Sequence, residues 1–197
     1  MNIPKLYIFD LGGVCIFNFQ TLGKIASTYH LEEQVLIDYY MTFDRDLMEG
    51  TVTTKQLWVE AAKKYGLDEG ADPLVDLFTV YANTPLLEQI RRMKQAGIRV
   101  VCGSNTCEPH WLKMEKAGDL EQLFDACYLS QRMHLSKPDP RFFQEILKKE
   151  QVEAKDAIFI DDTKANTESA EKLGLRTIWY HDDFIWSALD KVAATWG

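Results

Sequence analysis

The sequence predicts an α/β fold in which a doubly wound parallel sheet carries a small helical insertion after its first strand. Three observations lead to this prediction. Short apolar, β-rich runs alternate with segments of helical periodicity along most of the chain. The helical segments are about ten to fifteen residues long, which suits right-handed crossovers between parallel strands, with helices on both faces of the sheet. One long stretch after the first run has helical patterns only.

The first predicted strand is the apolar run KLYIF, which ends directly before Asp10. Gly12 and Gly13 follow at once, so the backbone turns at a point where a side chain would obstruct a close approach. Four further runs of the same character occur later in the chain, separated by helical segments. The runs cover residues 97–105, 124–130, 156–162 and 175–183, and the helical segments cover residues 84–97, 108–118, 138–150 and 163–174.

Residues 17–83 are the exception to this alternation. They contain no predicted strand, and their helix-like segments lie at residues 21–30, 32–50, 53–66 and 71–82. The third segment opens in the manner of a capping box, which marks a helix N-terminus. We therefore expect a core formed by residues 1–16 and 84–197, and a helical cap formed by residues 17–83 that acts as a lid on it.

The composition is that of an ordinary globular protein. Of 197 residues, 46% are hydrophobic and 26% are charged, and the formal net charge is -8. A chain this acidic is not expected to bind nucleic acid or an anionic membrane surface. It contains no apolar run of the roughly 18 residues that a membrane span requires. Since its start shows no secretory pattern, we expect a cytoplasmic protein whose partner is a small molecule, while the oligomeric state is not indicated.

Polar side chains follow four of the predicted strands, at the point where each strand ends. They are Asp10 after the first, Ser104 and Asn105 after the second, Ser136 and Lys137 on the loop beyond the third, and Asp161 and Asp162 after the fourth. Taken singly, each is also typical of a turn or a helix N-cap. The carboxyl ends of parallel strands, however, meet at one edge of the sheet, which is where ligands bind in such folds.

This edge would gather three carboxylates, which repel one another unless a cation lies among them. A hard divalent ion such as Mg²⁺ prefers carboxylate, carbonyl and water oxygens. The serine, asparagine and lysine side chains facing this ion would suit the charge of a phosphoryl group. The residues thus predict a site for magnesium and a phosphorylated small molecule.

Four motifs in this order resemble those of the haloacid dehalogenase-like hydrolase superfamily. They are YIFDLGGV, SNT, SKPDPRFFQ and FIDDTKANTESAEKLG. Within the superfamily they are most similar to the branch that holds α-D-glucose-1-phosphate phosphatases and the phosphatase domain of soluble epoxide hydrolases. The resemblance covers the whole chain, and it implies a Rossmann-like core with the insertion as its helical cap.

The resemblance implies a nucleophile and a magnesium site. Asp10 would be the nucleophile that forms an aspartyl-phosphate. Mg²⁺ would be held by Asp10, by the backbone carbonyl of Gly12 and by Asp162, with Asp161 reaching it directly or through water. Its role would be to neutralise charge, so that one anion can attack another.

The resemblance also implies the groups that bind the phosphoryl group. Ser104 and Lys137 would hold it, and Lys137 would contact the Asp10 carboxylate as well. Gly13 and Asn105 would offer backbone or amide donors to the phosphoryl oxygens. Asp10, Ser104 and Lys137 are therefore the predicted catalytic residues.

One position departs from the phosphatases of this superfamily. They usually carry a second aspartate, two residues after the nucleophile, that protonates the leaving oxygen, and Gly12 stands here instead. General acid–base catalysis typically supplies about 10²- to 10⁴-fold in rate. Three residues elsewhere are candidates to replace this group: His110, Asp44 and Glu108.

Three functional interpretations stay open at this point. The first is a magnesium-dependent phosphatase of a small phosphorylated metabolite such as glucose 1-phosphate, whose anomeric leaving group needs less protonation. The second is a protein that binds phosphate for regulation and has lost turnover. The third is a 2-haloacid dehalogenase, which needs no metal and is disfavoured by Asp161 and Asp162. We favour the first because the metal and phosphate groups are intact.

Substrate choice would be set by the cap and by the loop after the second strand. We predict three substrate contacts there. Arg45 on the cap would pair with a second anionic group. His110 and Trp111 directly follow the catalytic loop, a position from which side chains commonly reach a site.

Overall fold

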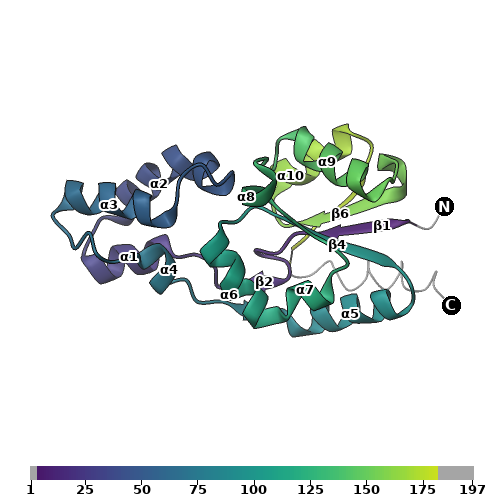
Figure 1. The fold of residues 1–197 in the computed structure, drawn as a ribbon, viewed down its shortest axis with the longest axis horizontal. Helices are drawn as coiled ribbons and strands as arrows, with labels where there is room; N and C mark the ends of the chain where they lie inside the picture. Colours follow the sequence, from purple (N-terminus) through teal and green to yellow (C-terminus); the bar gives the residue numbers. More distant parts are fainter. Residues whose placement is uncertain (1–3, 182–197) are drawn as a thin grey trace.

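The computed structural model describes residues 4–181 of the chain (Figure 1). In this part, five parallel strands form one sheet in the order β5-β4-β1-β6-β7. The strands are β1 (Leu6–Phe9), β4 (Arg99–Ser104), β5 (Cys127–Leu129), β6 (Ala157–Asp161) and β7 (Arg176–Trp179). The order reverses direction at β1, as in a doubly wound sheet, so the predicted fold class is confirmed. Residues 182 and 183 of the last predicted run, and the end of the predicted core range, lie outside the described residues.

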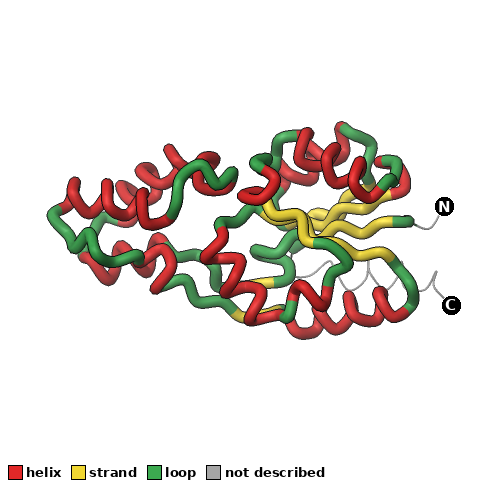
Figure 2. The backbone as a smooth tube through the Cα atoms, in the orientation of Figure 1, coloured by secondary structure: helices red, strands yellow, loops and turns green. Residues whose placement is uncertain are grey.

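Helices cover both faces of this sheet (Figure 2). Figure 1 shows α9 and α10 above it and α5 and α7 below it. The helices of this part are α5 (Thr84–Gln95), α6 (Glu108–Gly118), α7 (Leu120–Leu123), α8 (Ser130–Met133), α9 (Pro140–Glu150) and α10 (Lys164–Lys172), with a 3₁₀ turn at Ala154–Asp156. α9 begins at Pro140 and not at Pro138 as predicted, because the Asp139 side chain caps it by accepting from the backbone N–H of Arg141.

The central strand β1 is buried on both faces. Its side chains alternate between two apolar clusters, with Tyr7 and Phe9 on the side of α5, α6 and α7 and Leu6 and Ile8 on the side of α9 and α10. β1 pairs in parallel with β4 and with β6, and Phe9 lies opposite Cys102 and Ile160. The next residues along all three strands therefore emerge together at the carboxyl edge of the sheet.

Four helices lie between β1 and α5 and pack around an apolar cluster of their own, centred on the fully buried Trp58. We call α1 to α4 the helical unit. They are α1 (Leu22–Tyr29), α2 (Glu33–Met48), α3 (Thr54–Tyr65) and α4 (Pro73–Asp76). The capping box predicted for α3 is present between Thr53 and Gln56. α4 is much shorter than the predicted segment 71–82, because the chain becomes extended after it.

A two-stranded antiparallel ribbon joins the two ends of the helical unit. β2 (Ile16–Phe17) pairs with β3 (Tyr81–Ala82). The prediction that residues 17–83 contain no strand was therefore wrong, since strands this short carry no readable periodicity. Asn83 ties this ribbon to the first turn after β1 by donating from Nδ2 to the carbonyl of Val14, 2.9 Å away. The division into core and cap at these residues stays a prediction. Within residues 4–181, every helix is too short or too polar to cross a membrane.

Candidate active site

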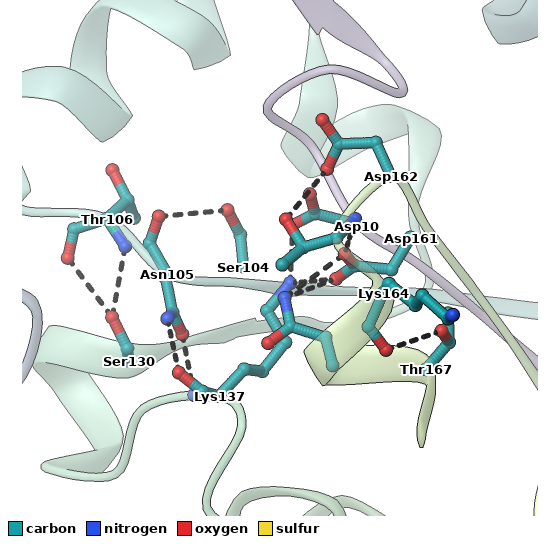
Figure 3. Close-up of polar contacts among 12 residues, drawn as sticks. Asp10, Ser104, Asn105, Thr106, Ser130, Lys137, Asp161, Asp162, Lys164 and Thr167 are labelled. Atoms are coloured by element: carbon teal, nitrogen blue, oxygen red, sulfur yellow. Dashed lines mark hydrogen bonds and ion pairs between the residues drawn. The ribbon is translucent and has the colours of Figure 1, made fainter. Parts of the chain in front are cut away.

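Asp10 is the first residue after β1, and its carboxylate is buried at the carboxyl edge of the sheet. The Lys137 Nζ lies 2.6 Å from Asp10 Oδ1 (Figure 3). Burial raises the pKa of Asp10 above the usual range of a carboxyl, and the ammonium of Lys137 acts against this rise. The residue predicted as nucleophile is thus held in a fixed position by a buried ion pair.

Lys137 also contacts a second carboxylate. Its Nζ lies 2.7 Å from Asp161 Oδ2, so one ammonium joins the residue after β1 to the last residue of β6. Burial disfavours the charged lysine, but Asp10 and Asp161 outweigh it and raise the pKa of Lys137. Lys137 is therefore a permanently charged group between two carboxylates.

Asp161 uses both of its oxygens within the protein. Oδ1 accepts from the backbone N–H of Thr163 at 2.7 Å, and Asn166 Nδ2 lies 3.1 Å from Oδ1 and 3.0 Å from Oδ2. Together with Lys137, these donors occupy the lone pairs of the carboxylate. Asp161 thus orients Lys137, and Asn166, which belongs to the fourth motif but was given no role from the sequence, fixes Asp161 in turn. The position of Asn166 within the fourth motif was the available signal.

Asp162 is half-buried and has a freer carboxylate. Burial, followed by the charge of Asp161, raises its pKa. Its backbone carbonyl accepts from the indole Nε1 of Trp179 at 2.8 Å, a contact that the sequence did not indicate. This bond ties the loop after β6 to the end of β7.

The three aspartates converge as predicted. One oxygen from each of Asp10, Asp161 and Asp162 lies within 4.8 Å of the others. Their three negative charges face the single positive charge of Lys137, so the cluster keeps an excess of negative charge. An all-oxygen donor set with this charge fits a hard divalent cation.

The two glycines after β1 differ in whether their surroundings would admit a side chain. Gly13 has a φ of +79°, and a β carbon on it would lie 2.0 Å from Asp162 Oδ2. Only glycine allows the turn and the carboxylate to approach so closely. A β carbon on Gly12 would meet only the ring of Phe19, at 3.7 Å, which is an ordinary contact. Gly12 is therefore not required by the space around it.

Ser104 is the last residue of β4 and Asn105 is the first residue after it, and their side chains make different contacts. Ser104 is buried beside the site, and its hydroxyl makes only a long contact of 3.5 Å to the Asn105 carbonyl. The Asn105 side chain forms two hydrogen bonds with the backbone of Lys137. Its Nδ2 donates to the Lys137 carbonyl and its Oδ1 accepts from the Lys137 N–H, each at 2.8 Å (Figure 3). One Nδ2 hydrogen and the Oδ1 of Asn105 are thus engaged by Lys137. That Asn105 offers a backbone or amide donor to the phosphoryl group stays a prediction.

A cavity of about 560 Å³ opens above these residues. Its polar end is formed by Asp10, Ser104 and Asp162 at the strand ends and by Lys137 on the loop before α9. Its other walls come from α1, α2, α4 and α6, so the helical unit and the sheet edge share one cavity. Its volume is typical of a site for a small organic ligand.

His110 lies in the cavity wall, as predicted, and it also binds the helical unit. Its Nε2 lies 2.8 Å from the Leu74 carbonyl, and its ring stacks on Phe78 with a centroid distance of 3.8 Å. Because a carbonyl only accepts, Nε2 carries the proton. Burial lowers the pKa of His110, so the imidazole is neutral at pH 7.

Three residues expected near the substrate lie elsewhere. Arg45 is exposed and pairs with Glu49 one helical turn on. Trp111 is buried in the apolar core beneath the sheet and does not line the cavity. Glu108 binds Arg132, which lowers its pKa, and it does not line the cavity. Asp44 does line it, at its exposed rim.

A carboxylate cluster at the switch point of a doubly wound sheet, with a buried lysine across it, defines a hydrolase-type enzyme site. The comparison with protein families agrees, since the family model described as haloacid dehalogenase-like hydrolase matches residues 8–180. The chain therefore belongs to the haloacid dehalogenase-like hydrolases.

Two curated relatives and several solved structures are similar to the chain. It is 30% identical to the drimenol cyclase drtB of Aspergillus calidoustus over 90% of its own length, but it spans only 34% of that protein. It is 28% identical to the sesquiterpene phosphatase astK of Aspergillus oryzae, over 87% of both chains. A family enzyme from Bacteroides thetaiotaomicron superposes with a TM-score of 0.81 at 24% identity, covering 96% of this chain and 99% of that one. A complex of that enzyme with magnesium and inorganic phosphate covers 94% and 98%, with a TM-score of 0.75 and again 24% identity.

Proposed function

We propose that the protein is a magnesium-dependent phosphomonoester hydrolase that acts through an aspartyl-phosphate on a small phosphorylated metabolite. The observation that carries this proposal is the shared ion pair: Lys137 lies 2.6 Å from Asp10 and 2.7 Å from Asp161. These contacts hold the Asp10 carboxylate in position to attack phosphorus. They also keep the positive charge of Lys137 where a phosphoryl group would develop negative charge. The magnesium and phosphate complex of the Bacteroides enzyme and the relative named as a phosphatase support it.

Asp10, Asp162 and the Gly12 carbonyl would hold Mg²⁺, with Asp161 next to it. When bound, the ion supplies charge neutralisation and a fixed orientation for the phosphoryl oxygens. The fit rests on the convergence of the three carboxylates and on the space that Gly13 leaves beside Asp162.

The residues then divide the reaction into two displacements. An Asp10 oxygen bonds to phosphorus while the ester P–O bond breaks and the leaving oxygen takes a proton, and water later attacks phosphorus to release phosphate and restore Asp10. Lys137 and Ser104 bind the transferring oxygens. The Asn105 side chain positions Lys137 by binding the Lys137 backbone, so this contact of Asn105 acts on the reaction indirectly.

Two of the three candidate proton donors face the cavity. Asp44 lies at its rim, where partial desolvation raises the pKa of this carboxyl and so favours the protonated form that an acid needs. His110 lines the wall with Nε2 bound to the helical unit. Glu108 is engaged by Arg132 outside the cavity, so Asp44 is the stronger candidate.

We also propose that the helical unit is a cap. It closes one side of the cavity and is held to the rest by contacts at two places. Lys113 on α6 donates to the carbonyls of Val75 and Phe78, at 2.5 and 3.1 Å. On the other side, Ser136 donates to Glu49 Oε1 at 2.9 Å, one residue before Lys137. Such contacts would exclude water from the site when the cap is closed.

A phosphate-release assay over a panel of phosphomonoesters, with glucose 1-phosphate as the sugar-phosphate candidate, tests the proposal. Release should require Mg²⁺, stop on chelation and fall by at least 10³-fold in Asp10→Asn. A protein that binds phosphate with Mg²⁺ but turns over no ester would be the regulatory alternative. Halide release from 2-haloacids without metal would instead indicate the dehalogenase.

A further inference from the structure

The cavity has two chemically different ends. The polar end holds Asp10, Ser104 and Asp162 at the ends of the strands, with Lys137 on the loop before α9. The opposite side is formed by side chains of α1, α2, α4 and α6 that share an apolar character. We call these the apolar wall: Leu22, Met41, Leu47, Met48, Leu74 and Met114.

Few polar side chains lie beside the apolar wall, and two of them are engaged within the protein. The Thr21 hydroxyl donates to a backbone carbonyl two residues away at 3.1 Å, and His110 Nε2 binds another at 2.8 Å. Tyr40 also lines the cavity, and its hydroxyl is shielded from solvent and has no hydrogen-bond partner among the described residues. Asp44 at the rim is left as an available polar side chain.

From this division we infer the class of substrate: a phosphate monoester of an apolar alcohol, with its phosphate at the strand ends and its hydrocarbon part against the apolar wall. The inference rests on the proposed phosphatase function and narrows its substrate. A sugar phosphate is a poor match, because its hydroxyls would find one free carboxylate among apolar side chains. Each buried hydroxyl without a partner weakens binding by roughly tenfold or more.

The size of the cavity agrees with such a substrate. Its 560 Å³ falls within the roughly 300 to 1,000 Å³ of sites that enclose drug-sized ligands, far beyond a phosphate ion. Hydrocarbon buried against the apolar wall improves binding by about fourfold per methylene. This gain in affinity should stop once the alkyl group of the substrate is longer than the apolar wall.

A series of ethyl, butyl, hexyl and octyl phosphates, compared with glucose 1-phosphate, tests the inference directly. With Mg²⁺ and wild-type protein, kcat/KM should rise about fourfold per methylene and by at least 10²-fold from ethyl to octyl phosphate. Glucose 1-phosphate should be no better than ethyl phosphate. A flat series, or a glucose 1-phosphate value above that of hexyl phosphate, would overturn the inference.

Two variants locate the effect on the apolar wall. Met48→Gln and Met41→Gln keep the length of the side chain and make it polar, and Met41 is already 62% exposed, so its variant should fold. Each should lower kcat/KM for octyl phosphate about tenfold and lower it much less for ethyl phosphate, so that the ratio of the two values falls. Leu112→Gln is the matched control, because Leu112 is 59% exposed on α6 and does not line the cavity. Equal losses in the control would contradict the assignment.

Binding of ethyl- and octylphosphonate tests the ligand class independently of the proposed phosphatase activity. These compounds carry a P–C bond that phosphatases do not break, and their affinities in the presence of Mg²⁺ are measured by calorimetry. If affinity rises with chain length while no ester is hydrolysed, the ligand class holds and the phosphatase proposal fails. If esters are hydrolysed with no dependence on chain length, the phosphatase proposal holds and the ligand class fails.

Discussion

Gly13 and Asp162 lie so close that a β carbon on the glycine would be 2.0 Å from the carboxylate oxygen Oδ2. The turn after β1 and the loop after β6 thus share a space that admits no side chain. Asp162 is one of the three converging aspartates, so this contact determines whether the cluster can form. Gly12, one residue earlier, has no comparable contact.

Gly13→Ala should therefore damage the metal site more than Gly12→Ala. Alanine at position 13 would strain the positive φ by about 1 kcal/mol or more and would displace Asp162. We expect Mg²⁺ affinity, measured by calorimetry, to fall at least tenfold in Gly13→Ala and by less than threefold in Gly12→Ala. Equal affinities in the two variants would show that the close approach does not shape the site.

Gly12→Asp should add an acid–base group at the position where Gly12 stands in place of the second aspartate. The β carbon fits beside Phe19, and the new carboxyl would follow the nucleophile at the spacing that phosphatases of this superfamily use. For an ester with a poor leaving group such as hexyl phosphate, kcat should rise roughly 10- to 100-fold. With p-nitrophenyl phosphate, whose leaving group needs no proton, the gain should be small. The same rise for both esters would speak against a role in proton transfer.

Asn105→Ala should affect catalysis through the backbone of Lys137. The loss of two hydrogen bonds at 2.8 Å should cost about 1 to 2 kcal/mol in the free energy of unfolding. We expect kcat to fall about tenfold, because Lys137 loses its fixed position, while KM changes less. Gln144→Ala, at an exposed position on α9, is the control. A rise in KM alone would mean that Asn105 contacts the substrate after all.

Glu150 gives the fold a dependence on pH that is separate from the site. Arg99 donates to it at 2.8 Å and Tyr128 at 2.5 Å. Burial works against the charged carboxylate, but these donors outweigh it and lower the pKa of Glu150. The folded state then binds fewer protons than the unfolded chain in the acidic range. The stabilisation is complete above the unfolded pKa of about 4.3 and is lost as pH falls through the lower folded value.

Glu150→Gln removes this contribution. Urea unfolding at pH 7 should show a loss of about 1 kcal/mol, a modest value because Arg99 is half-exposed. The difference between wild type and variant should shrink as pH falls from about 5 to about 3. A difference that stays constant over that range would mean that the charge of Glu150 is not involved.

Much of the core could be predicted because its signals are strong and local. Each sheet strand is a short apolar run between turn residues, and β1 is apolar at every position because it is buried on both faces. The ribbon of β2 and β3 could not be predicted, since two residues show no alternation. The end of α4 was missed because the apolar residues after it, such as Phe78, pack against α6 from an extended chain.

The part of the site that lies at the strand ends could be predicted from the sequence. Asp10 and Asp161 meet because parallel strands end at one edge of the sheet, and the alternation of strands and helices indicates that the strands are parallel. Lys137 reaches both carboxylates from the loop before α9. Arg45 and Trp111 were misplaced because a position in sequence does not tell which face of a helix meets the cavity. The apolar wall was not foreseen, because its residues on separate helices also look like ordinary core positions.

The central claim is that Asp10 carries the phosphoryl group during turnover. The most direct measurement is mass spectrometry of protein quenched with acid in the first turnover of a phosphomonoester, with and without Mg²⁺. We predict one added phosphoryl group on the peptide that contains Asp10, dependent on Mg²⁺ and absent from Asp10→Asn. Phosphate release at the wild-type rate with no adduct on that peptide, or with the adduct on another residue, would contradict it.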